Sequence, residues 1–288
     1  MIGVYDSGFG GLSVLRELRR VLAHHSFVYL GDSGRAPYGG RNADTVLDFA
    51  EQCVERLFEE GCRLIVVACH TVSCVGLRHL QQRYVAGRLR DRRILGVTIP
   101  AAEAAVRHSQ GHVGVIGTAR TIASCTFEME VHKLRNLRVS GVAAPLLAPI
   151  VEEGWETTDI AQSAVDKYVQ RFGDIDTLVL ACTHYPLLMD AFQRAIKARR
   201  RPVRILDPSP FVAERLVDWL RRHPHFDTQP TTSQGSLRCL CSGDPDVFRA
   251  EGQRFLGTPL STVQHIAEEH GRFTVRDSVL VRQGQVMR

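Results

Sequence analysis

The sequence predicts an α/β fold made of two pseudo-symmetric, doubly wound domains. Strands of buried type alternate with amphipathic helices, 288 residues exceed one ordinary core, and strand-to-helix segments repeat along the chain. The repeats keep nearly one offset, since Cys69 and Cys182 lie 113 positions apart (182 − 69) and Ser7 and Thr118 lie 111 apart (118 − 7). Two matched pairs indicate a duplicated half with one cysteine in each copy.

Each cysteine segment places a thiol where a buried strand ends and a helix begins. The first reads Leu-Ile-Val-Val-Ala-Cys-His-Thr over residues 64–71, and the second reads Thr-Leu-Val-Leu-Ala-Cys-Thr-His over residues 177–184. Open α/β sheets bind ligands at the carboxyl ends of their strands, and a helix N-terminus favours a thiolate. A buried cysteine usually only fills the core, so it is the repetition that makes Cys69 and Cys182 candidate reactive residues.

The composition is typical of a globular protein and excludes several classes. Hydrophobic residues make up 44% and charged residues 23%, and no run is long enough to span a membrane or to act as a secretory leader. The eight cysteines lie in strand and helix patterns, so we expect no disulfide framework and a cytoplasmic location. The net charge is +5, but the dense basic run at residues 199–204 has no interleaved aromatic residues, and nucleic-acid binding is not expected.

The first elements in chain order are a strand over residues 1–5, a glycine-rich turn and a helix with leucines at positions 12, 15 and 18. The turn fits neither a Walker A loop, which needs a lysine, nor a dinucleotide fingerprint, because Ser13 stands at the third glycine position. Its backbone amides still suit a carboxylate. Next come a strand over 27–30, a Gly/Pro-rich loop over 31–41, a helix over 44–60, the first cysteine strand and a helix over 71–84.

Two proline-containing segments predict where the chain crosses between the domains. A strand over residues 94–99 ends at Pro100, and the sequence Asp207-Pro208-Ser209-Pro210 follows a strand over 203–206. These crossings assign residues 1–98 and 208–288 to the first domain and residues 99–207 to the second.

The second domain is expected to hold a strand over 112–116, a helix from 119, a strand over 138–143, a turn over 144–149, a helix over 158–172, and the second cysteine strand with its helix. The chain then returns with a helix, a strand over 237–241, a helix over 245–255 and an extended tail from residue 257.

The cysteines and histidines near the strand ends lack the spacing of a zinc site. Structural zinc ligands usually come as Cys-x2-4-Cys pairs on knuckle loops, whereas Cys69, His70 and Cys74 follow one strand and Cys182 and His184 follow another. No metal ligand is therefore assigned. Five further cysteines need no role beyond packing: Cys53, Cys62, Cys125, Cys239 and Cys241.

Two reactive cysteines from related halves suit chemistry that needs two bases on opposite sides of one carbon. In a racemase or epimerase without a cofactor, one group removes a proton and the other returns a proton from the far face. Thiols suit this role because helix termini and histidine neighbours lower their pKa from ~8.5. A pyridoxal Schiff base would need a lysine in the site, but Lys133, Lys167 and Lys197 fall on predicted helix exteriors or ends. No cofactor is expected.

The motifs around these residues resemble those of bacterial glutamate racemases, within the Asp/Glu racemase superfamily. The resemblance covers residues 1 to about 257 and rests on Asp6-Ser7-Gly8-x-Gly10-Gly11, Pro37-Tyr38-Gly39, Ala68-Cys69-x-Thr71, Gly117-Thr118, Glu152-Glu153-Gly154 and Ala181-Cys182-Thr183-His184-Tyr185-Pro186. It implies two α/β domains with the active site and its glutamate at their interface, no cofactor, a homodimer, and a supply of D-glutamate to peptidoglycan.

The resemblance also implies roles for single residues. Cys69 and Cys182 would be the acid/bases that face D-glutamate and L-glutamate, assisted by Asp6 and His184 respectively, with Glu152 as a further polar neighbour. Hydroxyls and backbone amides suit carboxylates, while a carboxylate and an imidazole tune thiols. The substrate-binding set would be Asp6, Ser7, Pro37, Tyr38, Gly39, His70, Thr71, Thr118, Thr121, Thr183 and His184.

One position departs from the family pattern, because His70 stands where the family has asparagine. Histidine is bulkier, offers one donor when neutral and titrates near physiological pH. We therefore expect the activity toward glutamate to be lower than the motifs suggest. This activity should fall as the pH rises through the titration of His70. Two alternatives stay open: racemisation of another acidic or small amino acid, and a binding or regulatory protein that has lost turnover. The retained Cys69, Cys182, Asp6 and His184 argue against the second.

Overall fold

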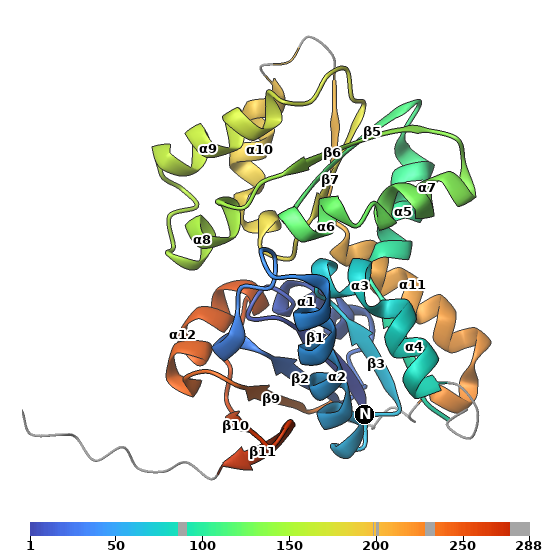
Figure 1. Cartoon of the computed structure of the whole chain (residues 1–288), viewed down its shortest axis with the longest axis vertical. Coiled ribbons are helices and arrows are strands. Elements are labelled where there is room, and N and C mark those ends of the chain that lie inside the picture. The colour runs from blue at the N-terminus through green and yellow to red at the C-terminus, as the bar shows by residue number, and fades with distance from the viewer. Residues whose placement is uncertain (86–90, 198, 200–201, 228–233, 277–288) are drawn as a thin grey trace, which may run out of the picture.

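The computed structural model describes residues 1–85, 91–197, 199, 202–227 and 234–276, and it consists of two stacked lobes (Figure 1). Within these ranges, one sheet has seven strands in the order β11-β10-β9-β2-β1-β3-β4, and the other has four in the order β6-β5-β7-β8. We call the larger sheet with its helices the first lobe and the smaller sheet with its helices the second lobe. None of the described helices is long and apolar enough to cross a bilayer.

The first lobe is built from both ends of the chain. Its strands are β1 (Ile2–Asp6), β2 (Phe27–Gly31), β3 (Leu64–Val67), β4 (Arg93–Gly96), β9 (Leu237–Cys241), β10 (Val263–Glu269) and β11 (Arg272–Arg276). Its helices are α1 (Leu12–Val21), α2 (Ala43–Glu59), α3 (His70–Val75), α4 (Leu77–Val85), α11 (Ser209–Arg222) and α12 (Pro245–Leu256), with 3-10 turns η1 (Ser33–Arg35) and η4 (Pro224–Phe226).

The second lobe is one continuous part of the chain. Its strands are β5 (His112–Gly117), β6 (Arg138–Ala143), β7 (Thr177–Ala181) and β8 (Arg204–Leu206). Its helices are α5 (Thr98–His108), α6 (Ala119–Ala123), α7 (Thr126–Leu134), α8 (Leu147–Glu152), α9 (Asp159–Val169) and α10 (Met189–Lys197), with the 3-10 turn η3 (Tyr185–Leu188).

The two lobes repeat one strand order, as the matched segments of the sequence predict. The order β2-β1-β3-β4 in the first lobe corresponds to β6-β5-β7-β8 in the second, and all these pairs are parallel. Parallel strands covered by helices on both faces read as continuous apolar runs, and β1, β2, β3, β5 and β7 are buried along their whole length. The sheet order reverses direction between β1 and β3, and again between β5 and β7, so each lobe has its switch point there.

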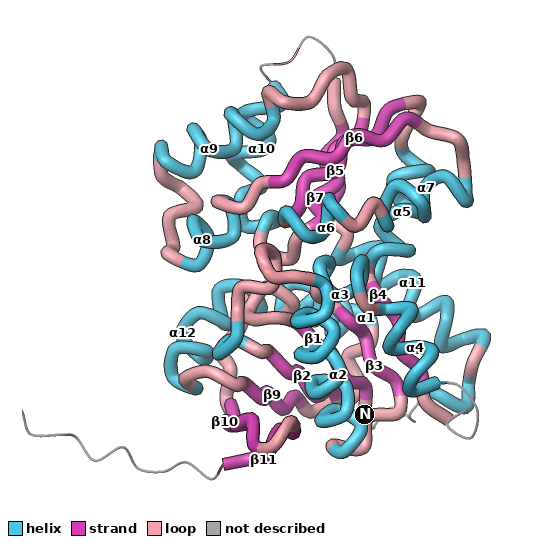
Figure 2. The backbone as a smooth tube through the Cα atoms, in the orientation of Figure 1, coloured by secondary structure: helices cyan, strands magenta, loops and turns pink. Residues whose placement is uncertain are grey.

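The switch points of both lobes face the same junction. The loops that follow β1 and β3 line one cavity together with the loops that follow β5 and β7, at the junction of the two lobes that Figure 2 shows. An apolar core passes through the junction, since buried residues of α1 and β3 belong to one cluster with buried residues of β7, η3 and α10. The carboxyl ends of four central strands therefore meet between the lobes, which is where open α/β sheets bind their ligands.

Some predicted boundaries were wrong where proline and glycine act inside a helix. The strand predicted over 94–99 ends at Gly96, and α5 begins at Thr98. Pro100 thus lies in the first helical turn, where a missing N–H leaves no bond unmade. The helix predicted over 71–84 is broken at Gly76 into α3 and α4. A Cβ on Gly76 would lie 2.8 Å from Leu47 Cδ2, so glycine leaves room at this turn for the Leu47 side chain of α2.

Two further boundaries differ in the second lobe. The turn predicted over 144–149 contains the start of α8, which continues to Glu152. The helix predicted from residue 119 is interrupted at Cys125, whose φ of 53° is left-handed. The expected strands at 138–143 and 237–241 and the extended tail from 257 are confirmed as β6, β9 and the β10–β11 pair. Residues 277–288 of the expected first domain, and Arg200 and Arg201 of the basic run, lie outside the described residues.

Candidate active site

A cavity with a free volume of about 40 Å³ lies between the lobes. Both cysteines line it, with Cys69 5% and Cys182 7% exposed. Its walls come from the loops after β1, β3, β5 and β7, the 31–41 loop and α8. The lining residues are Ser7, Gly8, Ala36, Pro37, Tyr38, Gly39, Cys69, His70, Thr71, Thr118, Ala148, Glu152, Cys182, Thr183 and His184.

Every site residue predicted from the sequence lines this cavity except Asp6 and Thr121, which lie one layer behind it. Asp6 is fully buried and accepts hydrogen bonds from Gly8 N at 3.0 Å and Thr183 Oγ1 at 3.5 Å. Thr121 Oγ1 lies 2.9 Å from Thr118 Oγ1, behind the wall. Sequence reasoning did not single out three lining residues, Gly8, Ala36 and Ala148. The first two lie inside or beside quoted motifs, but Ala148 carries no sequence signal.

Cys69 lies between the end of β3 and the start of α3, and its neighbours come from its own lobe. Its Sγ lies 3.5 Å from Ser7 Oγ, in the loop after β1. Burial, with a smaller contribution from the nearby Asp6 carboxylate, raises the pKa of the Cys69 thiol to about 12, against a lowering by the Ser7 hydroxyl. Burial also raises the pKa of Asp6. In the unliganded protein Cys69 is therefore a neutral thiol.

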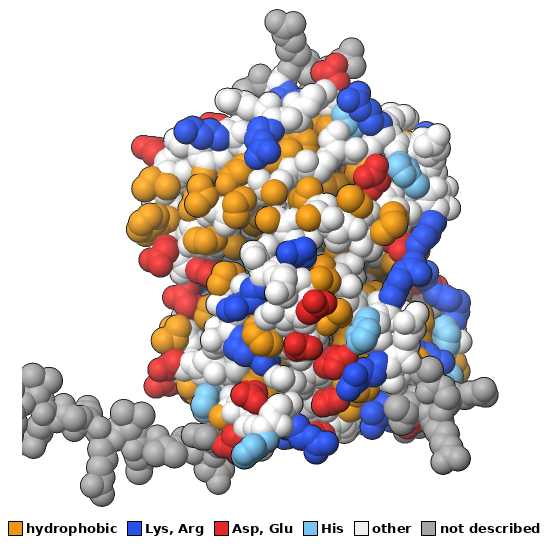
Figure 3. Space-filling view, in the orientation of Figure 1, with side chains coloured by type: hydrophobic (Ala, Val, Ile, Leu, Met, Phe, Trp, Pro, Cys, Tyr) orange, Lys and Arg blue, Asp and Glu red, His pale blue; other side chains and the backbone are white. Residues whose placement is uncertain are grey.

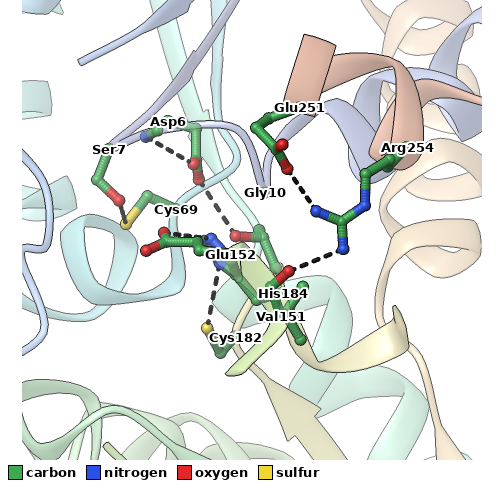
Figure 4. Close-up of polar contacts among 12 residues, drawn as sticks. Asp6, Ser7, Gly10, Cys69, Val151, Glu152, Cys182, His184, Glu251 and Arg254 are labelled. Carbon is green, nitrogen blue, oxygen red and sulfur yellow. Dashed lines mark hydrogen bonds and ion pairs between the residues drawn. The ribbon is translucent and has the colours of Figure 1, made fainter. Parts of the chain in front are cut away.

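Cys182 follows β7 and belongs to a relay of three side chains (Figure 4). Its Sγ lies 3.8 Å from His184 Nδ1, and His184 Nε2 lies 2.9 Å from Glu152 Oε1 on α8. Burial lowers the pKa of His184, but the Cys182 sulfur and the Glu152 carboxylate outweigh it and raise that pKa to about 10. The imidazole is therefore protonated at neutral pH, and a cation at this position stabilises a thiolate.

Hydroxyl groups from both lobes line the rest of the cavity. Thr71 Oγ1 of the first lobe lies 3.0 Å from Thr118 Oγ1 of the second. Thr118 also caps α6, since its Oγ1 accepts from Thr121 N at 3.1 Å. In the 31–41 loop, which packs against Thr118 at Gly39, the Tyr38 hydroxyl donates to the buried Asp32. The backbone of the 31–41 loop is held across the junction because Gly39 O accepts from Arg120 N at 3.0 Å.

His70 does not behave as the sequence suggested. It is 3% exposed, and neither ring nitrogen has a hydrogen-bond partner among the described residues. Burial lowers its pKa to about 4. The expectation that this histidine titrates near physiological pH was therefore wrong, because burial removes the hydration that the charged imidazole needs. It stays neutral, with one donor and one acceptor directed to no protein group.

The arrangement can move protons at two faces of a bound molecule. A thiol from one lobe and a thiol with an imidazolium neighbour from the other line the same small space. Among the described residues, no group of three or more histidine, cysteine, aspartate or glutamate side chains is placed to hold a metal ion.

The Asp/Glu/Hydantoin racemase family model matches residues 2–216. This chain therefore belongs to that family.

Individual relatives narrow the likeness to one kind of racemase. The chain is 37% identical to the glutamate racemase of Desulforudis audaxviator over 275 residues, 92% of this chain and 97% of the relative. A crystal structure of a glutamate racemase isoform from Bacillus anthracis matches with a TM-score of 0.85 at 33% identity, over 94% of this chain and 98% of that one. The Francisella tularensis glutamate racemase, solved with D-glutamate, matches with a TM-score of 0.83 at 28% identity, over 92% of this chain and 97% of that chain.

Proposed function

We propose that this protein interconverts L- and D-glutamate by a two-base mechanism without a cofactor. The observation that carries the proposal is the single cavity lined by one cysteine from each lobe. The glutamate racemases among its relatives, one of them solved with D-glutamate, supply the substrate.

In the L-to-D direction, the Cys182 thiolate removes the Cα proton of L-glutamate and becomes a thiol. The electron pair is delocalised into the α-carboxylate, and the Cys69 thiol then donates its proton to the opposite face of Cα, which leaves D-glutamate and a Cys69 thiolate. The D-to-L direction reverses each step. The protonation states favour the first direction in the free protein, because Cys69 is held as a thiol and His184 is held as an imidazolium beside Cys182.

The remaining lining residues are proposed to bind the substrate. The hydroxyls of Ser7, Thr71, Thr118 and Thr183 and the backbone amides of the turns suit its carboxylates and ammonium. Pro37, Tyr38 and Gly39 would form the part of the wall that packs against Thr118. Asp6 and Thr121 would act through their neighbours, since neither lines the cavity.

We further propose that residues 1–98 with 208–288, and residues 99–207, are domains that separate to admit substrate. The cavity volume of about 40 Å³ is the support. One water needs on the order of 10–15 Å³ on this measure, so the space holds a few waters but not an amino acid. Small-angle scattering with and without glutamate tests this separation, because a radius of gyration that is unchanged by substrate would contradict it.

The central experiment is turnover in deuterated water. Each enantiomer should give the other, with solvent deuterium at Cα of the product, because the proton removed and the proton returned belong to different thiols. Activity should survive exhaustive chelation in the presence of reductant, and the protein should lack the absorbance of a pyridoxal imine. Inactivity toward both enantiomers would contradict the proposal.

Racemisation of another acidic amino acid is favoured by one observation, the neutral and unpartnered His70 on the cavity wall. Its bulk reduces the space for a side chain. A panel of acidic and small amino acids in the same exchange assay decides this, because the preferred substrate has the largest kcat/KM.

We also propose that the protein is a cytoplasmic homodimer that supplies D-glutamate for peptidoglycan. Large apolar side chains are exposed near α8 and α9, namely Leu146, Trp155 and Ile160, and Figure 3 shows hydrophobic atoms gathered over this region. Sedimentation equilibrium tests the dimer. Rescue of a D-glutamate auxotroph by the intact gene, but not by the gene for Cys182→Ser, tests the supply role.

A further inference from the structure

One side chain of the first lobe holds the helix that carries Glu152. Arg254, on α12, donates from Nη2 to Val151 O at 2.8 Å and to both oxygens of Glu156, at 2.8 and 2.9 Å. Its Nη1 pairs with Glu251 on α12 itself. Val151 and Glu156 belong to α8 and the loop after it, in the second lobe, so the guanidinium bridges the lobes (Figure 4).

The loop after α8 is shaped around this guanidinium. Gly154 has φ of +73°, a left-handed conformation that ends the helix, and its N–H donates to Val151 O at 3.0 Å. A Cβ on Gly154 would lie 3.7 Å from Arg254 Nη2, so the guanidinium packs directly on the turn. Val151 O therefore accepts two hydrogen bonds, one from Gly154 N–H within the turn and one from Arg254 across the lobes. Because this carbonyl immediately precedes Glu152 in the chain, the bond from Arg254 helps to fix where Glu152 lies.

Helix α12, which carries Arg254, also contacts His184. The ring of the fully buried Phe255 packs edge-on against the imidazole, with centroids 5.3 Å apart and planes at 79°. The turn before α1 closes the other side, since a Cβ on Gly10 would lie 2.7 Å from His184 Nδ1. The titratable groups that face His184 are the Cys182 sulfur, the Glu152 carboxyl and the Asp6 carboxyl.

We propose that Arg254 is a positioning residue for the Glu152–His184 pair, so that the acid/base set of Cys182 is complete only when the two lobes are closed together. Cys69 needs no such support, because its neighbours Ser7 and Asp6 belong to its own lobe. Arg254 does not line the cavity and its donors are used by the protein, so it does not act on the substrate itself. This inference rests on the proposed racemisation, since it assigns a role within that site.

The test compares Arg254→Met, Arg254→Lys and Glu156→Gln with Arg249→Met, a matched control. Arg249 lies on the same helix and pairs with the exposed Asp246, away from the cavity. Arg254→Met should lower kcat about ten- to a hundredfold with little change in KM, because misplacing a catalytic group by ~1 Å costs up to ~10²-fold. Arg254→Lys and Glu156→Gln should lose less, and Arg249→Met should match the parent.

A second readout separates positioning from general destabilisation. Without Glu152 in place, the pKa of His184 should fall from about 10. Nuclear magnetic resonance of histidine-labelled protein, with His184 assigned through His184→Gln, measures this in the absence of substrate. It therefore tests the inference even if the parent does not racemise glutamate, a failure that would overturn only the proposed function. Folded Arg254→Met and Glu156→Gln proteins with an unchanged His184 titration would overturn the inference. If Arg254→Met does not fold, the titration of Glu156→Gln decides.

Discussion

A histidine lies beside each cysteine, and the two histidines are in opposite states. His70, next to Cys69, is buried without a hydrogen-bond partner in the described part of the chain, and its pKa is lowered to about 4. His184, two residues after Cys182, is equally buried, but it lies between a sulfur and a carboxylate, and its pKa is raised to about 10. Burial is common to both, so the partners decide the charge.

This difference makes the two halves of the site unequal in spite of the repeated fold. The Cys182 half contains a cation and a relay that reaches α8. The Cys69 half contains a buried carboxylate, Asp6, whose charge disfavours a thiolate. A duplicated strand order therefore places two thiols at equivalent positions, while unrelated neighbours put a carboxylate beside Cys69 and an imidazolium beside Cys182.

The largest expected effect comes from removing either thiol. Cys69→Ser and Cys182→Ser should each lower racemisation by on the order of 10²–10⁴ or more, because a serine hydroxyl cannot replace a thiolate as general base. In deuterated water, Cys69→Ser should still exchange the Cα proton of L-glutamate, and Cys182→Ser that of D-glutamate more slowly. Proton magnetic resonance measures the exchange at Cα, and chiral chromatography measures racemisation. Near-normal racemisation by either variant would show that the assignment of Cys69 and Cys182 as the two acid/bases is wrong.

Loss of the His184 imidazolium should have the second largest effect on racemisation. His184→Gln should lower kcat by ~10². In the parent, turnover should fall as the pH rises through about 10, because the protonated imidazole is the form that supports the Cys182 thiolate. Glu152→Gln should move that fall to lower pH, since it removes one cause of the raised pKa. Steady-state pH profiles provide the measurement, and a profile that Glu152→Gln leaves unchanged contradicts the relay.

The unpartnered histidine should make the fold sensitive to acid. The unfolded chain binds a proton at His70 below about 6.5, whereas the folded protein does so only below about 4. The contribution of neutral His70 to the free energy of unfolding is thus complete above pH 6.5 and is lost as the pH falls toward 4. The loss amounts to about 3 kcal/mol, since one pKa unit corresponds to ~1.36 kcal/mol. Urea unfolding at both ends of this range should show a smaller loss for His70→Asn than for the parent. Equal losses would mean that His70 is hydrated in solution.

The smallest expected effect is that of His70→Asn on kcat/KM for glutamate. His70→Asn restores the residue of the family pattern and should raise kcat/KM for glutamate by roughly three- to tenfold, since a smaller amide replaces a ring with unmet hydrogen bonds. It should not change the pH profile above neutrality, because His70 is already uncharged there. Loss of glutamate activity in His70→Asn would instead identify the histidine as suited to another substrate.

The sequence alone was a good guide to the strands and to the lining of the cavity, and a poorer one to helix ends. Apolar runs ending in Ala-Cys predicted β3 and β7 because a buried strand must exclude polar side chains. Helix ends at Gly76 and Cys125 were missed, because a close approach between helices and a left-handed residue are decided by packing. Arg254 was missed for the same reason, since a helix of ordinary pattern gives no sign that one arginine reaches the other lobe.

What the sequence determined by itself is therefore the α/β layering, the duplication and the position of two thiols at strand ends, because periodicity and residue type are local properties of the chain. Only the tertiary structure decided which groups carry charge. Burial and partner distance set the pKa of each side chain, and they arise from segments as distant as Arg254 and Val151, or Asp6 and Thr183. Two Cys-His neighbourhoods that look alike in the sequence are, for this reason, one neutral and one charged.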